Sequence, residues 1–595
     1  MKKKVISILL GIVGICLVLS IIYMVSRKRS SIKIEEAKKE EIEKQVDSVL
    51  AQMTIREKVA QLVFIQTDSY SQSSKHRERN EKLIKEGIGG MLILQDDLPR
   101  FVARMNELQK MAKIPLLVSI DGEWGPSMRF DEFPFFPQQM QLGALRDEKL
   151  IYKMGQAVAE QCKMVNIHIN YAPVVDINNN PRNPVINTRS FGEDRDNVAR
   201  KAKAYMQGMQ DGGIVACSKH FPGHGDTDVD SHKGLPVLPF DRKRLDSLEL
   251  YPFRDQIKNG VKMVMIGHLR VPALDKDISS ISYPIVTGLL REEMGFDGLI
   301  VSDALTMKGV SASMRAEEVA LAAYKAGVEI LLQPGNIEQS INRIEEAVKS
   351  GECSVEDLDR RVKKVLRMKA EMGMLDKQYT CQIDTIGISE RVVKSEHIAL
   401  SQLLSDKSMT LVNKKSKNIP LRRGSRIAYI GYNAQNIALQ RKYGDIEGLS
   451  GYNPVSGMVD STTLMYKHLQ KTLSARGCEV HYFALNKNSS RADINKVEKE
   501  LADYDVVILA CHSPDGYSRK NLISNEHKYA LSPLVSKYHP ILVHFGSPYG
   551  ISSLTWQKDV SDILVAYQDS EKNQYAAARV LTGEIVAEGK LPVGI

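Results

Sequence analysis

The stretch IVACSKHFPGHGDTDVDSH, residues 214–232, changes character near its middle. It begins with an apolar run, Ile214–Lys219, which is typical of a strand buried on both faces of a parallel sheet. Pro222, Gly223 and Gly225 then interrupt the pattern, so the residues that follow form a loop. Ionisable side chains therefore collect where this strand ends, and the same arrangement recurs along the chain.

Seven further apolar runs resemble this strand, and amphipathic helical patterns lie between several of them. The apolar runs are Leu62–Gln66, Ile88–Leu94, Leu116–Asp121, Ile167–Val175, Met263–His268, Leu299–Asp303 and Val328–Gln333. The helical patterns include Lys149–Val165, Asp194–Gly212 and Ala316–Ala326. Strands that alternate with helices predict an α/β fold, because parallel neighbours need a crossover connection. Eight such units predict a (β/α)8 TIM barrel, which we assign to residues 48–375.

A second pattern begins after a polar linker at residues 376–404. Residues 405–595 contain shorter apolar runs that alternate with helical patterns such as Asn495–Ala502. The runs are Ile427–Gly431, Val480–Ala484, Val506–Cys511, Ile541–Gly546 and Ile563–Tyr567. This alternation predicts a smaller α/β sandwich domain with a mostly parallel sheet. It contains neither a GxGxxG nor a P-loop motif, so we expect no nucleotide cofactor there.

The charge is unevenly distributed along the chain. The net charge of +9 at pH 7 arises from 81 basic and 72 acidic residues, and six of the basic residues fall within the first 29, which contain no acid. Without those six, 75 basic residues remain against 72 acidic ones, so the body of the protein is nearly neutral and no nucleic-acid partner is indicated. The seven cysteines form no CxxC pair, which argues against a disulfide framework or a zinc site.

The basic residues at the start flank an uninterrupted apolar run from Val5 to Val25. A helix of this length crosses a bilayer core of roughly 30 Å. The run lacks a small-residue cleavage site, which favours an uncleaved anchor over a cleaved signal peptide. We therefore interpret residues 1–30 as a signal anchor and transmembrane segment, and residues 31–47 as a charged stalk. We expect the two domains to be exported and held at the membrane.

Polar side chains mark the carboxyl ends of five of the expected barrel strands. They are Asp121, Asp176, Lys219 with His220, His268 and Asp303. In a TIM barrel these ends meet at one rim, and the active site is built there. The sequence therefore predicts one common site formed by residues that lie far apart along the chain.

The loop of residues 219–232 holds three histidines and three aspartates, and two chemistries use such a set. One is a metal site made of His220, His224, Asp226 and His232, because imidazole and carboxylate are common metal ligands. The other is acid/base catalysis, in which Asp230 accepts a hydrogen bond from His232 and fixes its tautomer. The spacing alone leaves both open.

Asp303 ends an apolar strand and would project at the rim. A carboxylate in that place can attack an anomeric carbon and stabilise an oxocarbenium-like transition state. The alternative is that Asp303 caps the helix that follows.

Several motifs together resemble family 3 glycoside hydrolases of the β-N-acetylglucosaminidase (NagZ-like) branch. They are KHFPGHGDTDVDSHKGLP (219–236), LAQMTIREKVAQL (50–62), SIDGEWGPSMRF (119–130), YAPVVDINNNPRNPVINTRSFGED (171–194) and VSDALTM (301–307). They span the expected barrel in order, and GKLPV (589–593) is similar to the end of that family's sandwich domain. The resemblance is therefore strong over the barrel and weaker after it.

The resemblance implies a retaining exo-β-N-acetylglucosaminidase that needs no cofactor and no metal. It makes Asp303 the nucleophile, His232 the acid/base and Asp230 the partner of His232. The residues that it assigns to sugar binding are Asp121, Arg129, Arg189, Lys219 and His220. The substrate it implies carries terminal β-linked N-acetylglucosamine, as peptidoglycan fragments do.

Other functions remain as alternatives. A phosphorylase or transglycosylase could use the same site, and a catalytically inactive protein that binds the cell wall could retain the fold. A metallohydrolase that uses the histidine-rich loop belongs to a different chemical class.

The chain departs from the branch in one motif of the barrel. Where the branch usually has two glycines after the aspartate, this chain has Gly122-Glu123-Trp124-Gly125. Trp124 either stacks on the leaving group of the substrate or packs beneath the loop.

Overall fold

The computed structural model describes Tyr23, Arg27 and residues 36–67, 73–312, 314–412, 415–434, 463–512 and 523–595. The predicted anchor, residues 1–30, lies outside this part of the chain apart from Tyr23 and Arg27. No helix within the described part is both long and apolar enough to span a bilayer. The predicted stalk is described only from residue 36, where a helix runs to residue 50.

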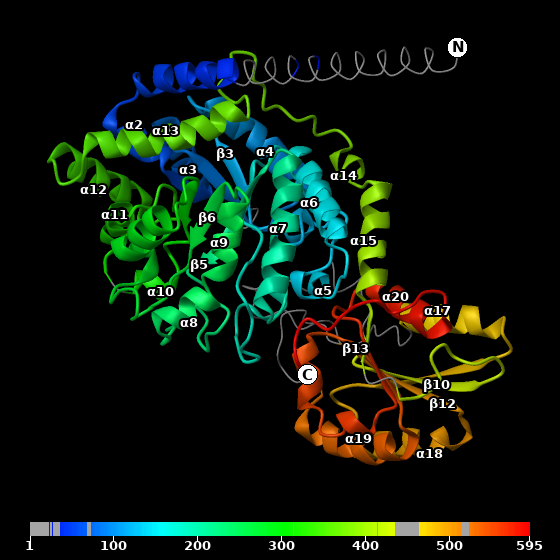
Figure 1. Cartoon of the computed structure of the whole chain (residues 1–595). Helices are drawn as coiled ribbons and strands as arrows, with labels where there is room; N and C mark the ends of the chain where they lie inside the picture. Colours follow the sequence, from blue (N-terminus) through cyan, green and yellow to red (C-terminus); the bar gives the residue numbers. More distant parts are fainter. Residues whose placement is uncertain are drawn as a thin grey trace, which may run out of the picture.

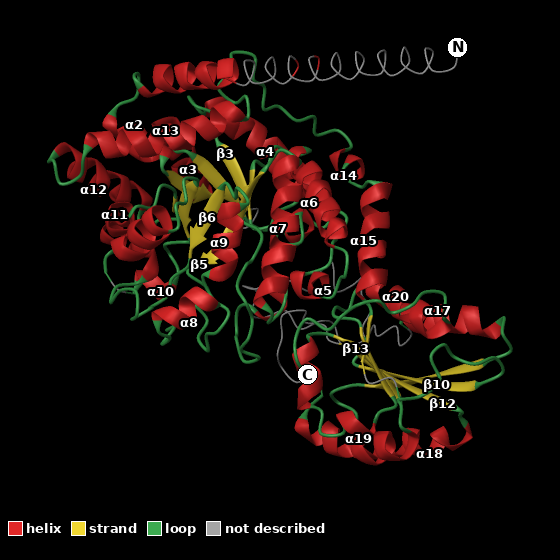
Figure 2. Cartoon of the chain, viewed as in Figure 1, coloured by secondary structure: helices red, strands yellow, loops and turns green. Residues whose placement is uncertain are grey.

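Eight strands form a parallel sheet that is nearly closed into a barrel (Figures 1 and 2). They are β1 (Val63–Gln66), β2 (Gly90–Ile93), β3 (Leu117–Ile120), β4 (Ile169–Asn170), β5 (Val215–Phe221), β6 (Met263–Ile266), β7 (Leu299–Ser302) and β8 (Leu331–Leu332). The sheet order is β7-β6-β5-β4-β3-β2-β1-β8, and a bridge between Val301 and Ile330 joins its two ends. Each strand lies within or next to its predicted apolar run, which confirms the barrel.

Helices surround the strands and bury their apolar faces against them. They are α2 (Ile55–Gln61), α3 (Ser74–Glu86), α4 (Leu98–Met111), α5 (Gln139–Gly143), α6 (Glu148–Lys163), α7 (Arg195–Asp211), α8 (Arg242–Ser247), α9 (Tyr251–Lys258), the π-helix Pro284–Glu293, α10 (Lys308–Ser311), α11 (Ala316–Ala326), α12 (Ile337–Lys349) and α13 (Val355–Glu371). Short polar side chains begin many of them: Asp147 and Asp194 each accept a backbone N–H of the first turn. The three predicted helices correspond to α6, α7 and α11.

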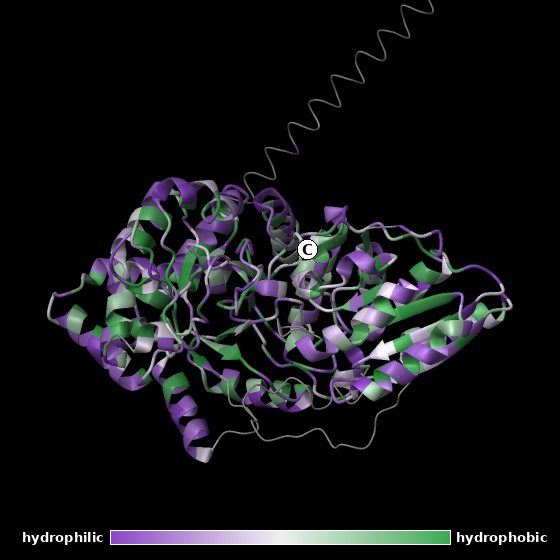
Figure 3. Cartoon of the chain, turned by 90° about the horizontal axis from the view of Figure 1, so that it is seen from below, coloured by the Kyte–Doolittle hydropathy of each residue, from purple (hydrophilic) through white to green (hydrophobic). Residues whose placement is uncertain are grey.

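The second domain contains a six-stranded sheet. Its strands are β9 (Thr410–Val412), β10 (Arg426–Tyr432), β11 (Glu479–Leu485), β12 (Val506–His512), β13 (Ile541–Phe545) and β14 (Asp562–Val565), in the order β11-β10-β12-β13-β14-β9. Its helices include α17 (Leu464–Ser474), α18 (Arg491–Glu500), α19 (Asn525–Tyr538) and α20 (Glu571–Thr582). β9 runs antiparallel to β14 and was not expected, because three residues are too few to show a strand pattern. Figure 3 shows the hydrophobic strands of this sheet beneath more hydrophilic helices.

The segment between the domains, predicted as a polar linker, is partly helical. It includes α14 (Ile388–Arg391) and α15 (Ser395–Ser408). Within α15, the Ser401 hydroxyl donates to the carbonyl of Phe135 in the barrel (2.6 Å), and Asp406 pairs with Arg579 of α20 (2.5 Å). The helix therefore contacts both domains, while the boundaries assigned at residues 375 and 405 stay predictions.

Candidate functional site

The predicted rim residues lie at the carboxyl ends of neighbouring strands. Asp121 directly follows β3, Lys219 and His220 lie near the end of β5, and Asp303 directly follows β7. Because all eight strands run the same way, these ends share one face of the barrel. They are also close enough to influence one another: His220, His232 and His268 each lower the pKa of Asp303.

Asp303 is half-buried and held by its own backbone. Its N–H donates to the carbonyl of Ile266 at the end of β6 (2.9 Å), and its Oδ1 accepts the N–H of Ala304 (2.8 Å). Burial opposes ionisation, but the nearby His268 and His220 side chains and the Ala304 N–H outweigh it, so the pKa of Asp303 lies below its ordinary value. The group is therefore a carboxylate at neutral pH.

His268 supports the loop that carries Asp303. Its Nε2 lies 3.0 Å from the carbonyl of Ala304 and its Nδ1 lies 2.7 Å from the hydroxyl of Ser280. A carbonyl only accepts, so Nε2 carries the proton and donates it. Burial lowers the pKa of His268, which leaves the ring neutral at physiological pH.

His232 lies on the loop after β5 and pairs with Asp230. The His232 Nδ1 is 2.9 Å from Oδ1 of Asp230, and the same oxygen accepts the backbone N–H of His232 (2.9 Å). The His232 side chain is 61% exposed. The loop tip contacts the segment after β7, because the N–H of Gly309 donates to the carbonyl of Ser231 (3.1 Å).

A buried charge network occupies the rim between β3 and β5. Lys219 Nζ lies 2.5 Å from Asp121 Oδ1 and 3.0 Å from Glu123 Oε1. Arg189 donates to both oxygens of Glu123, with a shortest contact of 2.7 Å. Burial would raise the pKa of Glu123, but the positive charges of Arg189 and Lys219 hold it well below the ordinary value. Two cations and two carboxylates therefore stabilise one another.

Arg129 orients Asp121 from the other side. Its Nε donates to the backbone carbonyl of Asp121 (3.0 Å), and its Nη2 lies 4.0 Å from the carboxylate. Both side chains keep some exposure, 20% for Arg129 and 25% for Asp121. They can therefore offer charged hydrogen-bonding groups to a ligand in the barrel mouth.

Consecutive residues Lys219 and His220 both reach the site, although neighbours in a regular strand face opposite sides. The pairing of β5 with β6 changes register between Ser218 and Phe221, and the two residues lie at this irregularity. Arg189 connects the two residues. It pairs with Glu123, which also contacts Lys219, and its Nη2 lies 3.3 Å from Nε2 of His220.

The histidines of the alternative metal site have separate hydrogen-bond partners. His220 Nδ1 bonds Asp176 (2.7 Å), and the ring nitrogens of His224 bond the hydroxyls of Thr227 (2.8 Å) and Ser231 (3.1 Å). Burial lowers the pKa of His224 to about 4, so this ring is neutral near pH 7. Across the described residues, no three or more His, Cys, Asp or Glu side chains are arranged to hold a metal ion.

Three residues of this site were not assigned a role from the sequence. Glu123 was seen only as a departure from a motif, and Asp176 and His268 only as polar strand ends. The signal that could have identified Glu123 is a charged residue within a stretch otherwise rich in Gly and aromatic residues. Trp124 beside it is only 7% exposed and lies 6.5 Å from the ring of Phe135, so it packs beneath the loop.

The second domain contacts the loop that carries Arg189. The Tyr549 hydroxyl donates to the carbonyl of Asn178 (2.5 Å) and accepts from its side-chain amide (3.0 Å). The Ser547 hydroxyl donates to the side chain of Asn187, two residues before Arg189 (2.9 Å). The placement of Arg189 therefore depends on both domains.

The same asparagine-rich loop also holds the loop that carries His232. The side-chain amide of Asn183 donates to the carbonyls of His224 (2.7 Å) and Gly225 (3.0 Å), and that of Asn180 donates to Asp228 (3.0 Å). The loop of residues 178–190 thus lies between the second domain and the loop that carries His232.

Two family models match the chain. Residues 54–368 match the glycosyl hydrolase family 3 N-terminal domain, and residues 409–595 match the glycosyl hydrolase family 3 C-terminal domain. The matched ranges include every rim residue described above as well as the second sheet.

Two bacterial proteins illustrate the related sequences. Beta-hexosaminidase A of Pseudoalteromonas piscicida is 30% identical in an alignment of 388 positions that covers 59% of this chain and 64% of that protein. A beta-N-acetylglucosaminidase/beta-glucosidase of Cellulomonas fimi is 28% identical over 360 residues, 59% of this chain and 63% of that protein. The chain thus spans slightly less than two thirds of the length of these relatives.

A solved structure matches almost end to end. The glycoside hydrolase family 3 beta-N-acetylglucosaminidase of Paenibacillus sp. strain FPU-7 has a TM-score of 0.72 and 28% sequence identity. The match covers 91% of this chain and 99% of that one. Both domains therefore have their counterparts in a single known architecture.

Proposed function

The chain belongs to glycosyl hydrolase family 3, and from this membership we propose that it is a retaining exo-β-N-acetylglucosaminidase. Its substrate would be terminal β-linked N-acetylglucosamine on peptidoglycan fragments or related oligosaccharides. The names of the bacterial relatives and of the Paenibacillus structure support this sugar class.

One observation carries the proposal beyond the family. An ionised carboxylate, Asp303, and a histidine–carboxylate pair, His232 with Asp230, lie on two loops that touch through Gly309 and Ser231. A nucleophile and a proton donor on adjacent loops are the two groups that a retaining glycosidase needs.

In the first step, the Asp303 carboxylate attacks the anomeric carbon and the bond to the leaving oxygen breaks. His232 Nε2 gives its proton to that oxygen, while the contact from Nδ1 to Asp230 fixes the tautomer and stabilises the charged ring. The product of this step is a glycosyl ester on Asp303.

In the second step, His232 takes a proton from water and the hydroxide releases the sugar from Asp303. Two inversions at the same carbon retain the β configuration. The charged groups of Asp121, Arg129, Arg189, Lys219 and His220 hold the sugar ring through hydrogen bonds to its hydroxyls.

The test is turnover of 4-nitrophenyl N-acetyl-β-glucosaminide by the chain lacking residues 1–30. We expect Asp303→Ala to be nearly inactive, because no other group forms the ester. His232→Ala should lose about 10²–10⁴-fold, and less when the leaving group is a better one, since such a group needs less help from an acid. NMR of the first-formed product should show the β anomer.

Asp297→Ala is the matched control. Asp297 lies just before the opposite end of β7, and its carboxylate is exposed. We expect it to retain full turnover. Folded wild-type protein that turns over no substrate between about pH 5 and 8 would contradict the proposal. Glycan binding without turnover would then indicate the inactive wall-binding alternative.

Phosphorolysis is a second candidate because the proton donor is a histidine. A neutral imidazole repels phosphate less than a second carboxylate would. Formation of sugar 1-phosphate in phosphate buffer would identify this reaction, and free sugar alone would exclude it.

We also propose that Val5 to Val25 anchors the protein in the membrane and that both domains lie on its outer side. The length and the basic flanks of this apolar run support the proposal. Full-length protein should sediment with membranes and be cut by protease added to whole spheroplasts. Soluble or protected full-length protein would contradict it.

A further inference from the structure

The described part of the predicted stalk is docked on the barrel by hydrophobic burial. Its helix, residues 36–50, carries Ile42, Val46 and Leu50 on one side, because residues four apart share a helix face. Val46 is fully buried and Leu50 nearly so, and Ile42 is partly buried against the same barrel core. A helix held in this way is part of the barrel domain rather than a free spacer.

Charged contacts fix this helix against α13. The guanidinium of Arg367 donates through Nε and Nη2 to the two carboxylate oxygens of Glu43 (2.5 and 3.0 Å). One turn earlier on α13, Lys363 pairs with Asp47 (2.6 Å). A two-point contact from a guanidinium fixes direction as well as distance, so the helix has one orientation on the barrel.

Helix α13 crosses the amino-terminal end of the barrel. Its Arg361 donates to the carbonyl of Val328, just before β8 (2.9 Å). Its Lys364 donates to the carbonyl of Asp297, just before β7 (2.8 Å). Because the strands are parallel, these carbonyls mark the end opposite the rim. In Figure 1 the helix of residues 36–50 and α13 lie above the strands.

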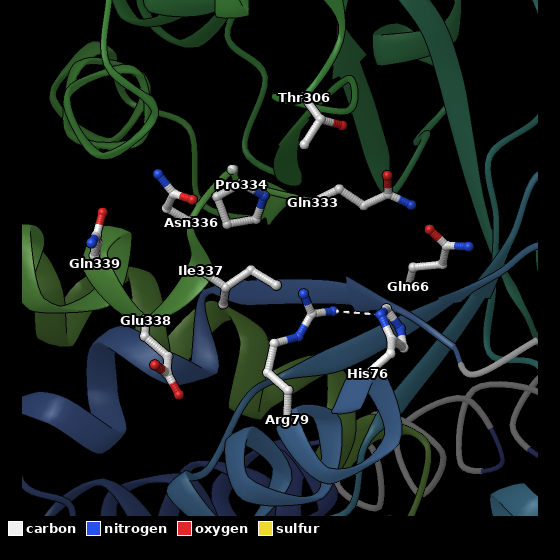
Figure 4. Close-up of a pocket in the computed structure, with 11 residues that line it drawn as sticks. Gln66, His76, Arg79, Thr306, Gln333, Pro334, Asn336, Ile337, Glu338 and Gln339 are labelled. Atoms are coloured by element: carbon white, nitrogen blue, oxygen red, sulfur yellow. Dashed lines mark hydrogen bonds between the residues drawn. The ribbon is translucent and has the colours of Figure 1, made fainter. Parts of the chain in front are cut away.

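The barrel opens at its other end. A cavity of about 450 Å³ lies there, lined by Gln66 at the end of β1, Gln333 after β8 and Thr306 after β7. Figure 4 shows these side chains around the open space. Thr306 is three residues after Asp303, so the opening and the proposed nucleophile share one end of the barrel. The docked helix and the active-site mouth are therefore at opposite ends.

The tether between the proposed anchor and the docked helix is short. Ten residues, 26–35, separate the apolar run that ends at Val25 from this helix. Even a fully extended chain of that length spans only about 35 Å. A domain of the barrel's size has a radius of gyration of about 20 Å and is roughly 50 Å across. A mouth that faced the lipid would need a longer tether, because the tether joins the barrel at the far end.

The tethered end of the barrel also presents an exposed aliphatic side chain. The segment after α13 continues across this end, since the side-chain amide of Asn166, just before β4, donates to the carbonyl of Cys381 (2.8 Å). Ile386 lies five residues further on and is 80% exposed. Contact with a lipid surface would remove this apolar side chain from water, which is favourable.

We propose that the amino-terminal end of the barrel faces the membrane, with Ile386 beside the lipid, and that the active-site mouth opens away from it. The inference rests on the proposed anchor and adds the direction in which the site faces. The docked helix and the short tether together set this direction. Substrates then reach the site from the side away from the lipid.

The experiment measures energy transfer from a fluorophore on the protein to an acceptor on lipid headgroups. Full-length protein is placed in vesicles of phosphatidylcholine and phosphatidylglycerol. It carries Cys353→Ser and Cys381→Ser, because the other cysteines of the described residues are buried. The fluorophore is attached through Ile386→Cys or through Val237→Cys. Val237 is 45% exposed and its backbone bridges to Arg270, after β6 at the rim.

We expect the label at position 386 to lose most of its fluorescence to the acceptor and the label at position 237 to lose little. The double variant Val46→Asp with Leu50→Asp should remove this difference. It releases the helix, so the tether grows to residues 26–50, which reach about 85 Å when extended, and the mouth can then approach the lipid.

Ser48→Asp, on the exposed side of the same helix, is the matched control and should keep the difference between the two labels. Circular dichroism shows that each variant is folded, independently of its activity.

Two results would overturn the inference while the anchor holds. In one, position 237 transfers as much energy as position 386 or more, so the mouth does not face away from the lipid. In the other, the folded double variant keeps the difference between the labels, so the docked helix does not set the direction. If full-length protein fails to float with the vesicles, the proposed anchor falls and this inference falls with it.

Discussion

Glu123 links two cations, Arg189 and Lys219, in the barrel rim. It is 2% exposed and contacts both Arg189 and Lys219. Leaving one such charge without its partner is costly, because the solvent cannot reach it. The residue therefore holds in place two side chains that we propose bind the sugar.

Glu123→Gln should lower the free energy of unfolding by about 3–5 kcal/mol. It should also raise KM, since Arg189 and Lys219 would lose the group that orients them. Thermal unfolding and steady-state kinetics on the 4-nitrophenyl substrate measure the two effects.

Glu329→Gln is the control that separates an effect on stability from an effect on KM. Glu329 is equally buried and pairs with Arg291 (2.7 Å), but it precedes β8 at the opposite end of the barrel. The Glu329→Gln variant should be less stable than wild type and should have the same KM. Equal KM values in the two variants would show that Glu123 has only a structural role.

At the scale of single elements, α13 places a lysine inside the protein. Lys369 is fully buried, and its ammonium donates to the side-chain oxygen of Gln61 in α2 (2.8 Å). Burial lowers its pKa from 10.5 to about 7. The neighbouring His168, with a pKa of about 4, is neutral in this range. Burying Lys369 in its charged form therefore lowers the stability of the folded protein, and this loss disappears when the side chain gives up its proton.

The direction of the pH dependence follows from how many protons the folded and unfolded chains bind. Between pH 7 and 10.5 the unfolded chain keeps the proton of Lys369 and the folded chain does not, so the free energy of unfolding rises with pH. Relative to Lys369→Met, wild type should gain up to about 1.4 kcal/mol per pH unit in this window. Denaturant unfolding at about pH 6 and about pH 9 measures the difference.

Lys363→Met, the same change at a partly exposed position of α13 where the lysine pairs with Asp47, is the matched control for loss of a lysine. A difference between wild type and Lys369→Met that is constant over the two pH values would contradict a lowered pKa.

At the scale of the whole molecule, the second domain reaches the active site through hydrogen bonds rather than through a catalytic group of its own among the described residues. Tyr549 bonds Asn178, and the same loop carries Arg189 and contacts the loop that carries His232 through Asn183. A loop joined at both sides has less freedom than one held by the barrel alone. The second domain therefore pre-organises the site.

Tyr549→Phe tests this role, because it removes only the hydroxyl that bonds Asn178. We expect a loss of about 1–3 kcal/mol in stability and a raised KM, since Arg189 is less well positioned. Tyr466→Phe is the matched control: its hydroxyl donates to the carbonyl of Val480 within the second domain (3.2 Å). That variant should lose stability alone, and a raised KM in both would contradict a specific role for Tyr549.

Much of the fold could be predicted because its signals are local. An apolar run followed by polar residues is contained in consecutive positions, as in Ile214–Lys219, and eight such runs specify a parallel barrel. The meeting of Asp121, Lys219 and Asp303 then follows from topology, because parallel strands end at one rim. The second sheet was predicted in the same way, except for β9, whose three residues show no period.

The sequence by itself determined the barrel, the strand ends that carry the candidate catalytic groups and, by resemblance, the family. Only the tertiary structure decided that Glu123 pairs with Arg189, 66 residues away, and that Tyr549 contacts Asn178, 371 residues away. These contacts depend on how finished elements pack and on which side chains that packing removes from water. No pattern of neighbouring residues predicts either contact, because burial and pairing between residues so far apart in the sequence exist only after the chain has folded.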